Sequence, residues 1–190
     1  MQNQPPGPFC QLARQLQVTE RMQIALYENA AVALLTAPGQ VTSSIEGLRR
    51  SGFAASRLSV AGAACRNRRE VAACYDRGGR PKCWADAGAF WGGLWETLDG
   101  WGFFAFPDIG PVLVAGPLSG WIVTILENSS IFDGLSALGA ALYSIGVAGD
   151  QIFRYEAALK SGKILLLAHG SADEVTRAGQ ILRSIPATIS

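Results

Sequence analysis

Positive charge is missing from a long stretch of the chain, because residues 83–153 contain no Lys and no Arg. The same 71 residues contain seven acidic residues and all five tryptophans of the protein. The remainder carries all 16 Lys and Arg against eight acids, so the two parts have formal charges of about −7 and +8. The sequence therefore predicts an apolar, acidic insert between two pieces of a basic domain.

Histidine is almost absent, since His169 is the only one in the chain. A Ser-His or Cys-His nucleophilic pair would have to use this residue. His169 ends an apolar run, a position that favours a structural, hydrogen-bonded histidine. Neither a GxGxxG nor a Walker A pattern occurs, so no phosphate-binding loop is indicated. We therefore expect no catalytic residues, no cofactor and no enzymatic activity.

The four cysteines lack a CxxC pattern. Cys65, Cys74 and Cys83 recur every nine residues, which with one distant histidine makes a weak zinc set, so we expect no metal. The dipeptide 78–79 is Gly-Gly, a two-residue turn signal. A hairpin on this turn would place Cys74 opposite Cys83 in a close pair without hydrogen bonds, near enough for a disulfide under oxidising conditions.

Positive charge concentrates in the connection before the insert. Only Tyr75 offers a stacking surface there, so nucleic-acid binding is not favoured over a cluster that faces solvent or a protein partner. The residues of this basic cluster are Arg66, Arg68, Arg69, Arg77, Arg80 and Lys82.

The first residues lack the apolar core and the cleavage site of a signal peptide. We therefore expect a cytoplasmic protein with mostly reduced cysteines. Residues 1–29 include spaced apolar positions, from Leu12 to Leu26, that predict a helical extension covering the main domain.

The basic parts read as strands and helices. Residues 30–37 and 163–169 are continuous apolar runs, typical of strands buried on both faces. Residues 40–51 and 171–184 have helical periodicity, and Ser171 with Glu174 forms a capping box. A helix is expected over 150–161, and a strand with one wet face over 57–62.

This order predicts an α+β fold, a ferredoxin-like split β-α-β sandwich interrupted by an apolar helical insert. The expected organisation is an extension over 1–29, a first half of the core with a basic hairpin over 30–82, the insert over 83–149 and a second half over 150–190. The two apolar strands should be parallel neighbours at the sheet centre, with helices 40–51 and 171–184 on one face.

The insert itself allows three interpretations. Uncharged runs of 18 residues (109–126) and 16 residues (134–149) approach the length of a membrane span. They could form a membrane-anchoring helical hairpin, pack on the sheet as core, or bury their apolar surface against other copies. The absence of flanking Lys or Arg argues against the membrane, because no positive-inside signal is present.

We favour self-association, since an acidic insert on one copy could meet the basic cluster of another. A small-ligand binder or enzyme, with a pocket between sheet and insert, is the third possibility. The expected assembly or membrane contacts are the tryptophans and closely spaced glycines of the insert, including a GxxxG pattern. They are Trp91, Trp95, Trp101, Gly116, Gly120, Trp121, Gly139 and Gly146.

Several segments together carry a family resemblance. They are the Gly/Pro-rich segment 106–117 (FPDIGPVLVAGP), the shorter motifs LRRSGF at 48–53, IGV at 145–147, YE at 155–156, LKSG at 159–162 and LLAHG at 166–170. In these the chain resembles a bacterial general-stress-protein-like family, a domain of unknown function. The resemblance covers roughly residues 30–190 with gaps. It implies a ferredoxin-like core with a hydrophobic insert and an association with stress, and it implies no catalytic residues.

Overall fold

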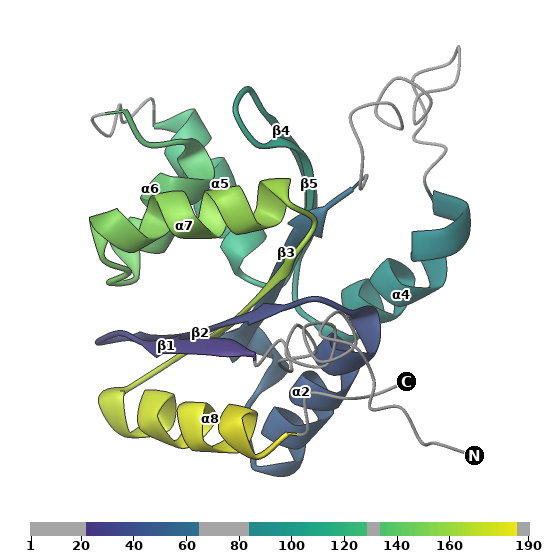
Figure 1. The fold of residues 1–190 in the computed structure, drawn as a ribbon, viewed down its shortest axis with the longest axis vertical. Helices are drawn as coiled ribbons and strands as arrows, with labels where there is room; N and C mark the ends of the chain where they lie inside the picture. Colours follow the sequence, from purple (N-terminus) through teal and green to yellow (C-terminus); the bar gives the residue numbers. More distant parts are fainter. Residues whose placement is uncertain (1–21, 65–83, 129–133, 186–190) are drawn as a thin grey trace, which may run out of the picture.

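A computed structural model describes residues 22–64, 84–128 and 134–185, and for 84–87 the backbone alone. Its centre is a six-stranded sheet in the order β1-β2-β6-β3-β5-β4, in which every pair of neighbours is antiparallel (Figure 1). The strands are β1 (Gln23–Leu26), β2 (Ala30–Leu35), β3 (Leu58–Ala63), β4 (Trp101–Phe106), β5 (Gly110–Ala115) and β6 (Ile164–His169).

Helices cover both faces of this sheet. They are α2 (Pro38–Arg50), α4 (Trp84–Thr97), α5 (Leu118–Glu127), α6 (Ala137–Ser144), α7 (Gly149–Lys160) and α8 (Ala172–Ser184), with a 3-10 turn η1 (Ala55–Arg57). Buried residues of α2, α4 and α8 share one hydrophobic core, and those of α5, α6 and α7 share the other. The α+β class predicted from the sequence is therefore confirmed.

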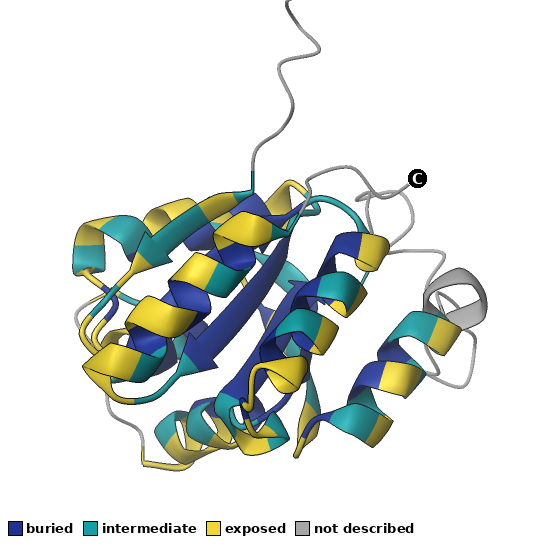
Figure 2. Ribbon diagram, turned by 90° about the horizontal axis from the view of Figure 1, so that it is seen from below, coloured by how far each residue is buried: buried dark blue, intermediate teal, exposed yellow. Residues whose placement is uncertain are grey.

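Burial on both faces explains the continuous apolar strands. In β2, Ala31 and Leu35 belong to the core of α2, α4 and α8, whereas Val32 and Leu34 belong to the core of α5–α7. Successive side chains of a strand point to opposite faces, so a sheet covered twice needs apolar residues at every position. Figure 2 shows the middle strands buried along their length, while the helices are buried only on the side that meets the sheet.

The sheet contains two split β-α-β units. α2 joins β2 to β3, and β6 lies between these strands, antiparallel to both. Helices α5–α7 lie between β5 and β6 in the chain, and β3 separates those two strands in the sheet. The split arrangement is thus present twice, and the ferredoxin-like detail stays a prediction.

The expected parallel pairing of 30–37 with 163–169 is wrong. β2 and β6 are neighbours, but they run antiparallel, with Ala30 opposite His169 and Leu35 opposite Ile164. A strand that fills the gap of a split unit runs opposite to the two strands that flank it, and β6 fills the gap between β2 and β3. The placement of α2 and α8 on one face is confirmed.

The insert is not entirely helical. After α4, the chain forms the β4–β5 hairpin, and the uncharged run 109–126 is divided between β5 and α5. Pro111 and Pro117 prevent one continuous helix over this run, because proline lacks the N–H and clashes with the preceding turn. The aromatic sequence of β4 suits a strand instead.

Two smaller expectations also fail. Residues 23–26, expected within a helical extension, form the edge strand β1, which pairs with β2 and directs Ile24 toward the core. β3 has no wet face, because residues 58–62 are all buried. Its one polar side chain, Ser59, accepts a hydrogen bond from the Leu118 backbone N–H at 3.1 Å, which satisfies both groups at the start of α5.

Candidate functional site

A continuous row of aromatic rings leads from the core to the surface of the insert. Trp91 of α4 is 4% exposed. Its ring centroid lies 6.5 Å from that of Trp95, which in turn lies 5.5 Å from that of Trp101. Trp101 begins β4 and is 66% exposed, the largest exposed fraction among the large apolar side chains of the described residues. The row therefore ends in an indole that meets solvent.

The β4–β5 hairpin brings this indole to the edge of the sheet (Figure 1). The two strands pair from Trp101 opposite Ala115 to Phe106 opposite Gly110. At the open end of the hairpin, the Gly116 N–H donates to the Gly100 carbonyl at 2.8 Å. β4 contains three phenylalanines and no charged residue. The structure thus holds an apolar strand at the sheet edge.

The GxxxG at 116–120 does not lie on one helix, which corrects its expected role as a flat helical surface. Gly116 precedes α5 with a φ of 93°, and an added Cβ there would collide with the Leu58 carbonyl oxygen. Gly120 lies within α5, is exposed, and has open space around an added Cβ. Only Gly120 of this pair is free to contact another molecule.

The remaining predicted contacts of the insert serve the fold itself. Gly139 packs α6 against α7, where an added Cβ would lie 2.8 Å from Ile152 and 2.9 Å from Glu156. Gly146 follows α6 with a φ of 93° and faces the β1–β2 turn. Trp121 is half-buried, and its ring meets the His169 ring edge-on at 4.9 Å. Gly146 lies outside α6, so Gly139 and Gly146 do not form one helical surface, and their spacing in the sequence could not separate contacts within a copy from contacts between copies.

Among the described residues, most of the exposed large apolar side chains belong to the insert. In the described part of the chain, six large apolar side chains are exposed, and four of them lie within the insert. These four are Trp101, Val123, Leu126 and Tyr143; the other two are Leu26 and Phe153. Contiguous apolar surface is typical of interaction sites, and among these side chains Trp101 is the most exposed.

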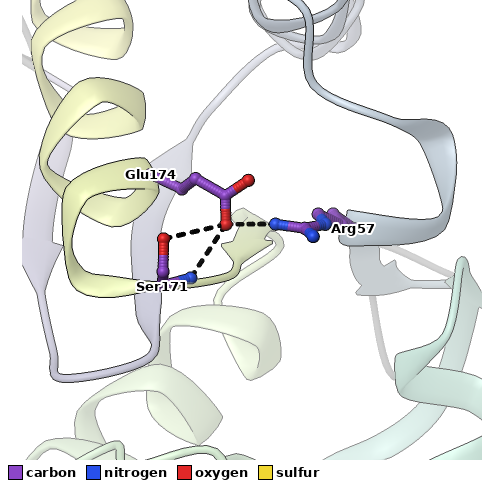
Figure 3. Close-up of polar contacts among 3 residues, drawn as sticks. All are labelled: Arg57, Ser171 and Glu174. Atoms are coloured by element: carbon purple, nitrogen blue, oxygen red, sulfur yellow. Dashed lines mark hydrogen bonds and ion pairs between the residues drawn. The ribbon is translucent and has the colours of Figure 1, made fainter.

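A polar cluster of Arg57, Ser171 and Glu174 lies where β6 ends (Figure 3). One carboxylate oxygen of Glu174 accepts hydrogen bonds from the Ser171 backbone N–H at 2.9 Å and the Ser171 hydroxyl at 3.1 Å. The Arg57 guanidinium forms an ion pair with the same oxygen. The Ser171 N–H first, and then Arg57, lower the pKa of Glu174. The capping box was predictable, but Arg57 as its partner was not, because 117 residues separate it from Glu174.

His169 lies beside this cluster. Burial, and then the positive charge of Arg57, hold the pKa of His169 below its usual value, although a hydrogen bond with the Arg57 backbone and the charge of Glu174 oppose this shift. Its Nδ1 is buried and has no hydrogen-bond partner among the described residues. Its ring packs against that of Trp121, and the structural, hydrogen-bonded role expected for this histidine stays a prediction.

We expect the free energy of unfolding to fall as the pH is lowered from about 7 to 5. In the unfolded chain His169 binds a proton near pH 6.5, whereas its lowered pKa in the folded protein delays protonation. As the pH falls, the unfolded state therefore binds the proton first, and the equilibrium shifts toward unfolding. Urea titrations at several pH values measure this loss, and His169→Gln should remove it. A second loss, from Glu174, should begin below about pH 4.5 and persist in His169→Gln. An unchanged pH profile in His169→Gln would contradict the assignment.

Some predictions fall on residues that the structure does not describe. The thiol pair Cys74–Cys83 and the basic cluster (Arg66, Arg68, Arg69, Arg77, Arg80 and Lys82) both lie in 65–83, outside the described residues. Within the described ranges, no group of three or more His, Cys, Asp and Glu side chains could hold a metal ion. No helix in those ranges combines the length and the apolarity needed to cross a membrane.

No protein-family model, curated protein or solved structure matches the chain. The resemblance to a general-stress-protein-like family therefore stays a prediction.

Proposed function

We propose that the protein is a non-enzymatic, self-associating protein whose copies assemble through the insert. The observation that carries this proposal is Trp101, an indole that is 66% exposed on an uncharged edge strand. Tryptophan is enriched at the centres of protein interfaces, because it combines a large apolar area with few rotamers to immobilise. Two exposed apolar residues of α5, Val123 and Leu126, add to the surface of the same insert.

The structure refines which predicted contacts serve this proposal. Trp91, Gly116 and Gly139 are used within one copy, so the proposed interface depends on residues that the fold leaves exposed. Trp101 and Gly120 meet that condition. The charged residues of the insert that lie near β4, Asp99 and Asp108, are also exposed and frame the apolar surface.

Sedimentation velocity of the detergent-free protein over a wide concentration range tests the proposal. We expect the mean mass to rise with concentration, and Trp101→Ala to shift this rise to higher concentration by about tenfold or more, the usual loss for a central interface tryptophan. Phe153→Ala is the matched control, because Phe153 is 59% exposed but lies in α7, beyond the end of the insert at residue 149.

A wild-type protein that stays monomeric at all concentrations would overturn the proposal. Recovery only in the membrane fraction would replace it with the alternative of an insert that anchors the protein to membranes. Equal effects of Trp101→Ala and Phe153→Ala would show that association is not specific to the insert.

A further inference from the structure

The backbone hydrogen-bonding groups of β4 divide into two sets. Residues that pair by hydrogen bonds with β5 alternate with residues that point away from it. The Pro111 carbonyl accepts from the Ala64 N–H at 2.9 Å, so Pro111 points toward β3 and makes no bond to Ala105, its opposite residue on β4. The Gly116 N–H donates to Gly100, so that pair is hydrogen-bonded.

Counting along the ladder from either end gives the same result. At Gly102, Phe104 and Phe106, the backbone N–H and C=O groups form hydrogen bonds with β5. At Trp101, Phe103 and Ala105, these groups point to the free edge of the sheet. In the described part of the chain, no strand pairs with that edge. β4 is also six residues long, whereas β1 at the opposite edge has four.

We propose that β4 pairs edge to edge with β4 of a second copy, antiparallel and about a two-fold axis at Phe103. This inference rests on the proposed self-association and names its contact. In this register Phe103 faces Phe103 of the second copy, and Trp101 faces Ala105 of the second copy. All three outward residues of each copy then exchange N–H···O=C bonds, and the two sheets become one.

Side-chain size selects a second copy as the occupant. Trp101, Phe103 and Ala105 share one face of the strand because they alternate with residues of the other face. Trp101, the largest of the three side chains, therefore faces Ala105, the smallest, at both ends of the paired strands. The two Phe103 rings meet at the centre. Both Trp101 and Ala105 are exposed, so this space is open in the single copy. β4 contains no charged residue, so nothing on this strand would attract an acidic or a basic peptide instead.

The edge lacks the features that usually prevent such pairing. Natural edge strands avoid association through lysines, prolines, bulges or short length, and β4 contains no lysine or proline. The exposed Asp99 and Asp108 lie just beyond its two ends. In the proposed register Asp99 of one copy approaches Asp108 of the other, so these acids oppose association without blocking it.

Ala105→Pro tests the backbone contact. Proline removes an outward N–H but no hydrogen bond to β5, and its φ is acceptable at a sheet edge. We expect the dissociation constant to rise by at least about tenfold, since the symmetric pair loses two bonds and their geometry. Ala105→Ser is the control, because it keeps the N–H at the same position. Circular dichroism and urea titration should show that both variants fold.

Cysteine cross-linking tests the register. Phe103→Cys should form a disulfide between two copies, because facing Cα atoms of a hydrogen-bonded pair lie about 5.5 Å apart. Trp101→Cys alone should not cross-link to itself, since the two sites would lie about 14 Å apart along the strands. A mixture of Trp101→Cys and Ala105→Cys proteins should cross-link. Peptide mass spectrometry identifies each bond, so the native cysteines can remain.

Salt provides a separate criterion. Edge pairing should be unchanged or stronger at high salt, because screening reduces the repulsion between Asp99 and Asp108. Association that depends on attraction between the acidic insert and the basic cluster would instead weaken at high salt, because salt screens attraction as well. Association that weakens with salt, tolerates Ala105→Pro and gives no 103–103 cross-link would overturn edge pairing while self-association stands. A monomeric wild-type protein would overturn both.

Discussion

Gly116→Ala is expected to destabilise the protein by about 3 kcal/mol or more. A side chain at a φ of 93° costs about 1–2 kcal/mol. The added Cβ would also collide with the backbone of Leu58 and with Ser59, and overpacking of this kind costs a further 1–3 kcal/mol. Backbone atoms at the start of β3 cannot move aside without disturbing the central sheet, so we expect both costs to apply.

Two other glycines separate these contributions. Gly52 has a φ of 89° but open space around an added Cβ, so Gly52→Ala should show the conformational cost alone, about 1 kcal/mol. Gly120 is helical, exposed and unobstructed, so Gly120→Ala should stabilise by about 0.5–1 kcal/mol. Midpoints of urea unfolding at constant slope measure all three. If Gly116→Ala loses no more stability than Gly52→Ala, the close approach at Leu58 is not rigid.

Much of the fold was predictable because strong local signals decide it. The apolar runs that become β2 and β6, the helical periodicity of α2 and α8, and the capping box at Ser171 all depend on residues near one another in the sequence. Gly52 and Gly162 have positive φ values of 89° and 84° beyond α2 and α7, as glycines after helices commonly do.

The direction of β6 was not predictable in this way. It depends on which gap in the sheet the strand enters, and this is decided by packing between segments more than 100 residues apart. The same limit applies to Ser59, whose buried hydroxyl meets Leu118 at a separation of 59 residues. Nothing in the local sequence distinguishes a buried serine from one on a wet strand face.

The insert shows how a composition signal can mislead about structure. Lack of charge over 109–126 suggested a helix, but Pro111 and Pro117 already excluded a continuous one. The five tryptophans suggested one shared role, whereas Trp91 is 4% exposed and Trp101 66%. Periodicity identifies the face of an element, but exposure depends on what packs against that face.

Trp91→Ala is expected to destabilise the protein by about 3–5 kcal/mol, the usual cost of removing a buried aromatic ring. Trp91 and Leu94 are buried residues of α4, and Leu98, just after the helix, packs in the same core. The Trp91 ring lies directly over Gly62 of β3, where an added Cβ would be 3.0 Å from it. The cavity left by alanine would separate α4 from the sheet, and the absence of a side chain at Gly62 leaves nothing nearby to fill it.

Trp101→Ala provides the matched comparison, because it removes the same ring from the other end of the aromatic row. With 66% of Trp101 exposed, we expect stability to change by less than about 1 kcal/mol while self-association weakens. Urea unfolding followed by far-ultraviolet circular dichroism, at a protein concentration where both variants are monomeric, isolates the stability effect. Trp91→Ala should lose stability at that concentration, and Trp101→Ala should not. If Trp101→Ala were the more destabilised variant, the exposed indole would contribute mainly to the fold, and the self-association proposal would lose its principal support.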